Sequence, residues 1–414
     1  MSEWKKVKLG ELYEVHNGLS KGRQFFGTGF PFLTFSNVFN NWFLPDQLES
    51  LVQTTDKERE ACSIKAGDVF ITRTSETMDE LGMSSVALKD YPNATYNGFT
   101  KRLRPITNRV NPRYIGYYLR TPKFRGQFMA FSSMTTRASL ANNDLLNMEV
   151  ELPSMEIQHR IATILSRYDS LIESHLKQIK LLEEAAQRLY KEWFIDLHFP
   201  GHENTKIVDG VPEGWEKKKL CELFSFVRGK SYTSKELSDE GTIMVNLKNI
   251  QSFGGYKSDV EKHFIGTFKE EQTLMKGDLI MGVTDMTQER RLVGSVALIP
   301  DFKETATFSM DLIKLISFKL PNIYLYCAMR YGDVSRQIAP LANGVNVLHL
   351  KPEAISNIEM VVASDSTIEK FVSYTSKTIE SILSLQSQLR LLTEARDRLL
   401  PKMMSGEIKI ESLN

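Results

Sequence analysis

Three short segments hold residue types at spacings that could carry out chemistry, and each lacks a necessary part of its motif. Phe25–Gly29 fits the FxGxG loop of methyltransferases, but Pro31 follows at once, where a helix should open. Asn111–Tyr114 carries Arg where the adenine-holding NPPY motif needs its second proline. Gly229–Ser231 resembles the end of a phosphate loop, but Phe224 stands where that loop needs its first glycine. These departures predict a chain without a catalytic site of its own.

The histidines, cysteines and apolar residues also limit the class of protein. The three cysteines lie far apart without a CxxC pair, and the seven histidines lack metal-ligand spacing such as HxxxH. No zinc site or disulfide framework is therefore expected, and no bound metal or cofactor. No secretory signal and no run near 18 apolar residues is visible, so we expect a cytoplasmic protein.

The formal net charge of the chain is only +1, but positive charge gathers in one stretch. Residues 101–137 contain nine Lys or Arg and no Asp or Glu. Such a stretch is either an ordinary solvated face or a surface that faces phosphates, and its length without a balancing acid favours phosphates.

Side chains with paired donors and acceptors are the ones that read bases: Arg or Lys for guanine, and Asn or Gln for adenine. Loops next to strand ends are the natural places for them. In the first half of the chain the candidates are Lys21, Arg23, Thr72, Arg73, Thr74, Ser75, Lys101, Arg102, Arg104, Thr135, Thr136 and Arg137. In the second half they are Arg228, Lys230, Lys248, Asn249, Thr284, Gln288, Arg290, Arg291, Asn343 and Asn346.

The elements that must position these residues occur twice along the chain. Trp4, Leu9, Glu11, Leu12 and Gly18 recur at Trp215, Leu220, Glu222, Leu223 and Gly229, each 211 residues later. Further matches, such as Ser85–Leu88 with Ser295–Leu298, keep offsets between 210 and 212. A constant offset over most of the chain indicates a duplicated unit. Within each copy, residues 67–72 and 277–281 read as strands, and a helix is expected around 112–129.

Each copy ends in a segment with the apolar spacing of a long helix. The stripe of the first runs from Ile157 to Trp193 in steps of three or four residues. The second is expected to begin at a capping box, Ser366–Glu369, and to end or kink at Pro401. Helices of this length cannot bury their stripes within one small domain. We expect the two to pair antiparallel; two separate coiled coils with outside partners are the alternative.

The predicted fold class is α+β, with two similar recognition domains separated by a pair of long antiparallel coiled-coil helices and related by internal pseudo-twofold duplication. The expected boundaries are domain 1 at 1–153, the central helix at 154–198, a linker at 199–214, domain 2 at 215–363, the C-terminal helix at 364–400 and a tail at 401–414.

Four segments resemble the DNA-specificity subunits of Type I restriction–modification systems, and the resemblance covers essentially the full chain. Pro212–Leu220 (PEGWEKKKL) looks like the entry to a target-recognition domain. Glu151–Leu165 and Leu189–Asp196 look like the start and end of the family's central helix, and Arg398–Ile408 looks like its C-terminal tail. The opening of the second helix, with VVASDSTIEKFV, departs from the family pattern.

The resemblance implies a non-catalytic subunit that recognises an asymmetric, bipartite site on double-stranded DNA. Two methyltransferase (modification) subunits would use S-adenosylmethionine to methylate adenine. Restriction or motor subunits would use ATP and Mg to translocate and cut. Two other interpretations stay open: a single-chain DNA methyltransferase or nuclease, for which the motifs above are incomplete, and a coiled-coil scaffold that never reads DNA.

Overall fold

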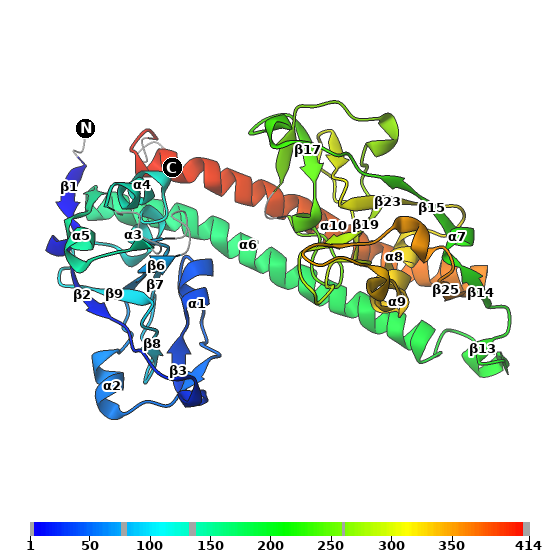
Figure 1. Ribbon diagram of the computed structural model, residues 1–414, viewed down its shortest axis with the longest axis horizontal. Helices are drawn as coiled ribbons and strands as arrows, with labels where there is room; N and C mark the ends of the chain where they lie inside the picture. The colour runs from blue at the N-terminus through cyan, green and yellow to red at the C-terminus, as the bar shows by residue number, and fades with distance from the viewer. Residues whose placement is uncertain (1–3, 76–80, 132–137, 259–260, 409–414) are drawn as a thin grey trace. The chain divides into compact units, whose positions relative to one another are not determined.

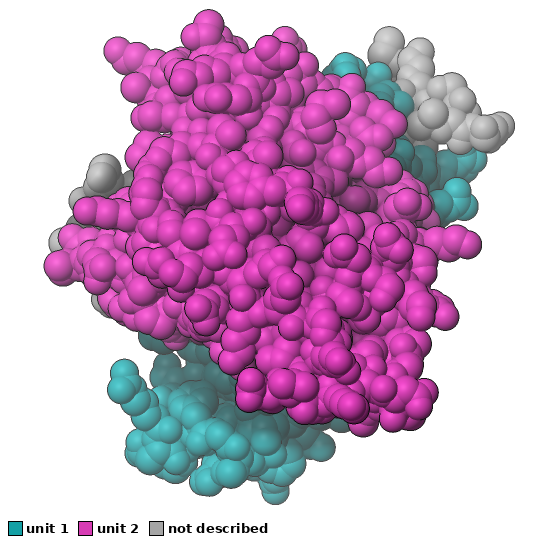
Figure 2. Space-filling model, turned by 90° about the vertical axis from the view of Figure 1, so that its right-hand side faces the viewer, with its two compact units in different colours: residues 1–170, 395–414 teal, residues 171–394 magenta. Residues whose placement is uncertain are grey.

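The computed structural model describes residues 4–75, 81–131, 138–258 and 261–408. The chain forms two compact units, coloured separately in Figure 2. Unit 1 consists of residues 1–170 together with 395–414, and unit 2 consists of residues 171–394. The chain thus enters unit 2 and returns to unit 1 before it ends.

The centre of unit 1 is an antiparallel sheet of four strands in the order β2-β9-β5-β7. These are β2 Tyr13–Asn17, β9 Thr100–Pro105, β5 Val69–Thr72 and β7 Ser84–Val86. Smaller pairings surround it: β1 Lys5–Lys8 with β11 Glu149–Leu152, β6 Thr74–Ser75 with β10 Ala138–Ser139, and β3 Phe26–Leu33 with β4 Leu51–Val52 and β8 Thr95–Tyr96. The helices are α1 Phe35–Asn40, α2 Asp56–Ala61, α3 Pro112–Tyr118, α4 Pro122–Phe131 and α5 Asn142–Asn147, with 3₁₀ turns η1 Leu9–Glu11 and η2 Arg23–Phe25.

Unit 2 has a central sheet with the same antiparallel order, β15-β23-β19-β21. These are β15 Phe224–Arg228, β23 Leu312–Ser317, β19 Leu279–Gly282 and β21 Val296–Leu298. Around it lie β14 Glu216–Lys219 with β25 Glu359–Val362, β20 Thr284–Asp285 with β24 Leu348–His349, β12 Ile207–Val208 with β13 Val211–Pro212, and a second sheet of β16 Leu237–Ser238, β18 Lys262–Phe264, β17 Thr242–Val245 and β22 Ala306–Phe308. The helices are α7 Leu220–Leu223, α8 Asn322–Tyr331 and α9 Val334–Ile338, and the 3₁₀ turns are η5 His202–Asn204, η6 Ser234–Glu236, η7 Leu247–Asn249, η8 Glu270–Gln272, η9 Ala339–Leu341 and η10 Pro352–Ile355.

The shared strand order confirms the duplication that the constant offset predicts. One repeated glycine shows why the same residue type recurs at this offset. At Gly18 an added Cβ would stand 2.0 Å from the carbonyl oxygen of Asn97, and at Gly229 the same distance from that of Ser309. Any larger residue would collide with backbone at the same turn of each unit, so glycine recurs there. The predicted α+β fold class is confirmed, and the strands expected within 67–72 and 277–281 are found as β5 and β19.

Two long helices run through the chain, α6 Met155–Tyr190 and α10 Asp365–Met404 (Figure 1). A π-helical turn, η4 Lys191–Ile195, continues α6. In the described part of the chain no helix is long and apolar enough to cross a membrane.

Within each unit, a segment of α6 packs with a segment of α10, and the two segments run in opposite directions. In unit 1 the start of α6 and the end of α10 share one apolar core, through residues such as Leu165 and Met403. In unit 2 the turn η4, which continues α6, meets the start of α10, where the rings of Trp193 and Phe371 lie 5.8 Å apart. The predicted antiparallel pairing is confirmed inside both units.

Three helix boundaries differ from the prediction. The second long helix starts at Asp365, because the Ser364 hydroxyl accepts from the backbone N–H of Thr367 at 3.4 Å and displaces the expected capping box. Pro401 lies inside this helix, so of the two expected outcomes, an end or a kink, the end is wrong. Only three helical residues follow Pro401. Proline cannot donate one backbone hydrogen bond, and losing that bond costs little in the last turn of a helix. The helix expected around 112–129 is interrupted between α3 and α4.

Candidate nucleic-acid interface

One end of the central sheet of unit 2 brings several loops together. Arg228, the last residue of β15, pairs with Ile313, and Gly282, the last residue of β19, pairs with Leu312, the first of β23. Because neighbouring antiparallel strands end and begin at this edge, the loops that continue from them emerge side by side. Most of the candidate base-reading residues of unit 2 belong to these loops.

Two of the loops are joined across the short ribbon of β20 and β24. The Nε2 of Gln288 donates to the carbonyl oxygen of Val345 at 2.8 Å. We call residues 286–288 and 343–346 the paired-loop surface. Asn343 and Asn346 are exposed on it, and so are two apolar side chains, Val345 with 87% of its surface accessible and Met286 with 77%. The surface therefore offers amide groups and apolar tips together.

Cations border the paired-loop surface. Arg228 is exposed and paired with Glu353 at 2.6 Å, a contact that water screens and a phosphate could replace. Lys230 is half-buried, and its backbone N–H donates to Phe308 at 2.8 Å, which fixes the loop after β15. Lys248 is exposed on η7.

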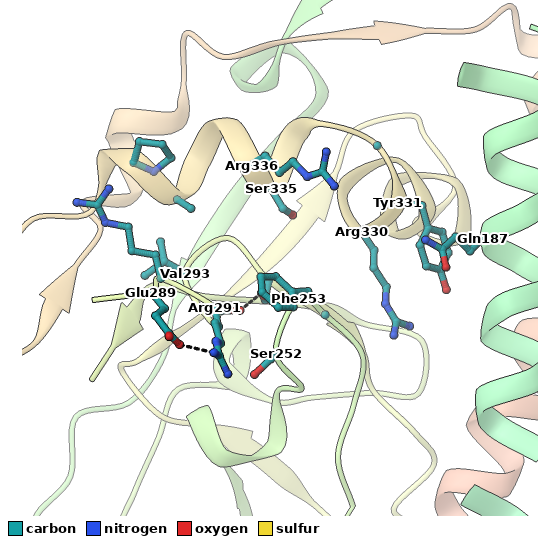
Figure 3. A pocket seen from close by; sticks show the side chains of 16 residues that line it. Gln187, Ser252, Phe253, Glu289, Arg291, Val293, Arg330, Tyr331, Ser335 and Arg336 are labelled. Atoms are coloured by element: carbon teal, nitrogen blue, oxygen red, sulfur yellow. Dashed lines mark hydrogen bonds and ion pairs between the residues drawn. The ribbon is translucent and has the colours of Figure 1, made fainter. Parts of the chain in front are cut away.

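Arg290 and Arg291 follow the paired-loop surface in the chain. Arg291 is exposed and forms an ion pair with Glu289 at 2.5 Å. Arg290 is half-buried, has a left-handed backbone with φ of 53°, and its buried Nε has no hydrogen-bond partner. Both residues line a cavity beside α9 (Figure 3).

Unit 1 shows the corresponding sheet end only in part. Arg23 is exposed there, whereas Lys21 is mostly covered and pairs with Glu58 at 2.8 Å. Arg73 is half-buried, and its backbone N–H donates to the carbonyl of Phe99, which stands exposed before β9. Thr74 and Ser75 form strand β6. Thr135, Thr136 and Arg137 lie outside the described residues.

The expectation of a phosphate-facing patch at Lys101, Arg102 and Arg104 is wrong. Arg102 is 2% exposed, and its guanidinium donates to the carbonyl oxygen of Ser63 at 2.7 Å. Arg104 forms a two-pronged contact with the buried Asp68, at 2.9 and 2.7 Å. Arg102 and Arg104 need no acid within the stretch, because their partners come from a segment that precedes it in the chain.

Lys101 is also buried, and its ammonium donates to the side-chain oxygen of Asn142. Burial lowers the pKa of Lys101, and the nearby charge of Arg73 lowers it further. A side chain enclosed in this way on a central strand cannot meet a phosphate without unfolding its surroundings. Its role in this structure is internal.

Unit 2 repeats this internal use of a cation on the central strand. Lys314 of β23 is buried, and its ammonium donates to the carbonyl oxygen of Thr273 at 2.8 Å. Thr273 follows Ser63 by 210 residues, the repeat offset. Lys314 also lies 3.7 Å from Asp278, the counterpart of Asp68. A cation that holds the same carbonyl in both copies belongs to the architecture of the unit.

Three further candidates are buried and serve the fold. The hydroxyl of Thr72 accepts from the backbone N–H of Met83, and that of Thr284 donates to Asp311 at 3.0 Å. Asn249 is fully buried, and its side-chain amide donates to the carbonyl of Lys257 at 3.2 Å. These side chains support the loops and do not reach a ligand directly.

Sequence reasoning missed the apolar part of the surface. Val345 and Met286 in unit 2, like Phe99 in unit 1, are large apolar residues exposed where strands end. The segment Asn343–Asn346 holds no usable signal, because Val347 and Leu348 follow Val345 at strand and helix spacing and make it look like a core residue.

Metal-binding clusters and cysteine thiols are two sources of chemistry to consider among the described residues. No group of three His, Cys, Asp or Glu side chains there is placed to hold a metal ion. Complete burial raises the pKa of the Cys327 thiol to about 12, so at neutral pH it is protonated and a poor nucleophile. The arrangement is suited to binding.

Comparisons with known proteins agree on one family. Residues 1–184 match the family model described as the Type I restriction modification DNA specificity domain. The chain is 26% identical to the Type I restriction enzyme MjaIX specificity subunit of Methanocaldococcus jannaschii, over 99% of this chain and 95% of that protein. It is 22% identical to the HindI specificity subunit of Haemophilus influenzae, over 99% and 100%. The crystal structure of a Type I S subunit from M. genitalium has the same fold, with a TM-score of 0.58, 15% identity and coverage of 97% and 96%.

Proposed function

Because the chain belongs to the family of Type I restriction–modification DNA-specificity subunits, we propose that each of its two units reads one half of a bipartite DNA site. The chain is the DNA-recognition component of such a system and leaves catalysis to other subunits. One observation carries the proposal: two units of identical strand order present loops of different sequence. Readers with the same frame and different loops recognise an asymmetric target.

The paired-loop surface of unit 2 has the chemistry for base reading. Asn and Gln side chains form two hydrogen bonds with adenine in the major groove, and apolar side chains contact the methyl group of thymine. Asn343, Asn346 and Gln288 supply the amides, and Val345 supplies an apolar tip. Arg228 and Lys230 stand beside them as phosphate contacts, which position a reader without carrying sequence information.

Other subunits complete the proposed assembly. Two methyltransferase subunits would use S-adenosylmethionine to methylate adenine in the half-sites, and restriction or motor subunits would use ATP and Mg for cleavage. No cofactor would be held by this chain, and the assembly would be cytoplasmic. The long helices support docking of partners, because Leu176 and Leu181 of α6 and Tyr374 of α10 remain exposed.

The test uses the chain assembled with its modification subunits and maps every methylated adenine on genomic DNA. Asn343→Ala with Asn346→Ala should change the recognised half-site of unit 2 and leave the other half-site intact. The matched control is Asn204→Ala. Asn204 is an exposed asparagine on η5, which precedes β15 in the chain, and this variant should leave both half-sites unchanged. If the double variant methylates the original site at the original rate, unit 2 does not read DNA through this surface. Loss of both half-sites would favour a scaffold whose shape alone supports its partners.

A further inference from the structure

A short turn leads into an inner strand of each central sheet, β9 in unit 1 and β23 in unit 2. In unit 1 the backbone N–H of Thr100 donates to the carbonyl of Asn97 at 3.2 Å, and in unit 2 that of Leu312 donates to the carbonyl of Ser309 at 3.0 Å. Both pairs of positions lie 212 residues apart, so the two turns are counterparts. In unit 2 this turn lies at the sheet end from which the paired-loop surface extends.

The last residue before the strand differs in chemistry between the units. It is Phe99 in unit 1, 59% exposed, and Asp311 in unit 2, which is half-buried. Their backbones make the same contact: the carbonyl of Phe99 accepts from the N–H of Arg73 at 3.0 Å, and that of Asp311 from the N–H of Val283 at 2.9 Å. Because this contact is shared, the two side chains start from equivalent points. An aromatic ring in one unit therefore corresponds to a carboxylate in the other.

A neighbouring position changes in the same sense. Leu19 in unit 1 and Lys230 in unit 2 form the same isolated bridge, each with the turn of its own unit. At these two positions unit 1 carries the apolar Leu19 and Phe99, whereas unit 2 carries the charged Lys230 and Asp311. Two readers with the same frame and different targets must differ in chemistry where they meet the bases, and these positions differ in that way.

The carboxylate of Asp311 is held in place from one side. The hydroxyl of Thr284, which is 4% exposed, donates to Oδ1 of Asp311 at 3.0 Å. Thr284 belongs to β20, and the chain continues from β20 directly into the paired-loop surface. In the described part of the chain no donor or cation pairs with the other oxygen, Oδ2. The carboxylate thus keeps a fixed acceptor for a ligand at this sheet end.

The charge of a carboxylate limits what it can contact on DNA. It repels phosphates, so its approach is favourable only where a base donates a hydrogen bond to it. In the major groove these donors are the amino groups of cytosine and adenine. Adenine also presents N7, an acceptor, beside its amino group, whereas the amino group is the only polar group on the cytosine edge. A carboxylate without a donor of its own therefore favours cytosine.

We propose that Asp311 reads one cytosine of the half-site recognised by unit 2, by accepting a hydrogen bond from the amino group of that base. Thr284 is a positioning residue, because it acts through the carboxylate that it orients. The inference rests on the proposed function, since it requires this end of unit 2 to face the major groove. Phe99 stands at the corresponding place in unit 1, so the other half-site is not read by a carboxylate there.

The first test is Asp311→Asn in the chain assembled with its modification subunits. The hydroxyl of Thr284 keeps the amide oxygen on its own side, so the unfolding midpoint should not change and the amide nitrogen replaces Oδ2. That nitrogen is a donor and meets the amino group of cytosine, which is also a donor. In competition titrations with each base pair exchanged in turn, the preference for cytosine over adenine should fall at least about tenfold at one position of the unit 2 half-site. The unit 1 half-site should be unaffected.

The matched control is Asp209→Asn. Asp209 is exposed in the β12–β13 hairpin, and its φ of 50° is one that asparagine also adopts. This variant should leave every base preference as it is. A second measurement needs no variant: each cytosine of the unit 2 half-site is replaced by N4-methylcytosine, which still pairs with guanine but carries a methyl group where its free N–H faces the groove. Binding of the original chain should weaken about tenfold at one cytosine, and Asp311→Asn should lose this penalty.

Three results overturn the inference. One is that no N4-methylcytosine weakens binding of the original chain. Another is that Asp311→Asn weakens binding to all sequences equally, which means that Asp311 only shapes its turn. The third is a changed preference centred on a base other than cytosine. If Asn343→Ala with Asn346→Ala still changes the unit 2 half-site, the proposed function stands without this inference; if that variant also changes nothing, both fail.

Discussion

The exposed valine of the paired-loop surface allows a sharp test of base reading. We predict that Val345→Ala weakens binding to the recognised site because Val345 contacts the methyl group of a thymine. With 87% of its surface exposed in the free protein, nearly the whole side chain is available to be covered by DNA. For the same reason the substitution should change the stability of the fold by no more than about 0.5 kcal/mol.

The size of the effect follows from the number of methyl groups that are removed from the contact. Val→Ala removes two methyl groups, and at about 0.8 kcal/mol for each buried carbon this amounts to roughly 1.6 kcal/mol, or about fifteenfold in affinity. Replacing the contacted thymine by uracil removes one methyl group and should cost about 0.8 kcal/mol, or about fourfold. Since both changes remove the same contact, the uracil penalty should disappear in the variant.

The assay is a competition titration at one fixed salt concentration, with each thymine of the unit 2 half-site replaced in turn by uracil. Val208→Ala provides the matched control, because Val208 is 55% exposed on the β12–β13 hairpin away from the paired-loop surface. The reasoning is refuted if no single uracil weakens binding of the unmodified protein. It is also refuted if the uracil penalty is the same in Val345→Ala as in the original chain.

Three other predictions follow from the interior of the units and from the helices. Arg104→Ala should lower the free energy of unfolding by about 3–5 kcal/mol, because Asp68 would stay buried without its partner; an unchanged urea midpoint would contradict this. Burial raises the pKa of Glu261 to about 7, so the folded state holds its proton between about pH 4.5 and 7, and stability should fall by up to about 3 kcal/mol as pH rises through this window. Glu261→Gln should remove that slope in unfolding experiments, and an identical pH profile would argue against it. Inserting seven residues into both long helices, near Ile179 and Leu389, lengthens each by about 10 Å and keeps the apolar stripe in phase. Methylation profiles should then show a gap longer by up to about three base pairs between unchanged half-sites, and an unchanged gap would mean that the helices do not set the spacing.

The duplication and the helices could be predicted from the sequence because their causes are local or repeated. Gly18 and Gly229 mark the same close backbone approach, and such a requirement appears directly as a residue type. The apolar stripe from Ile157 to Trp193 reflects helical periodicity, which needs no knowledge of partners. Helix ends were less accessible, since the choice of Ser364 over Ser366 as cap depends on where β25 delivers the chain.

The candidate site was harder to predict because burial depends on residues far away in the chain. The charge of the stretch after Lys101 suggested a surface, but Arg104 meets Asp68, and only the folded sheet brings them together. Hydrophobicity misleads in the opposite direction at Val345, where a residue type that usually indicates a core stands in water. The sequence indicates which residue types to consider for an interface, but only the folded structure shows which of these residues are exposed.

The packing of the C-terminal end of α10 into unit 1 has a consequence for how the protein is made. Leu400, Met403 and Met404 are buried in the core of unit 1, although nearly all of that unit is synthesised first. At about 5–20 residues per second, a ribosome needs roughly 10–50 seconds to pass from residue 170 to residue 404. During this interval the nascent first unit exposes the apolar surface that these three side chains later cover, which makes it a substrate for chaperones. A chain that stops before Leu400 would leave that surface uncovered, so the last turns of α10 complete a core whose other residues are made long before them.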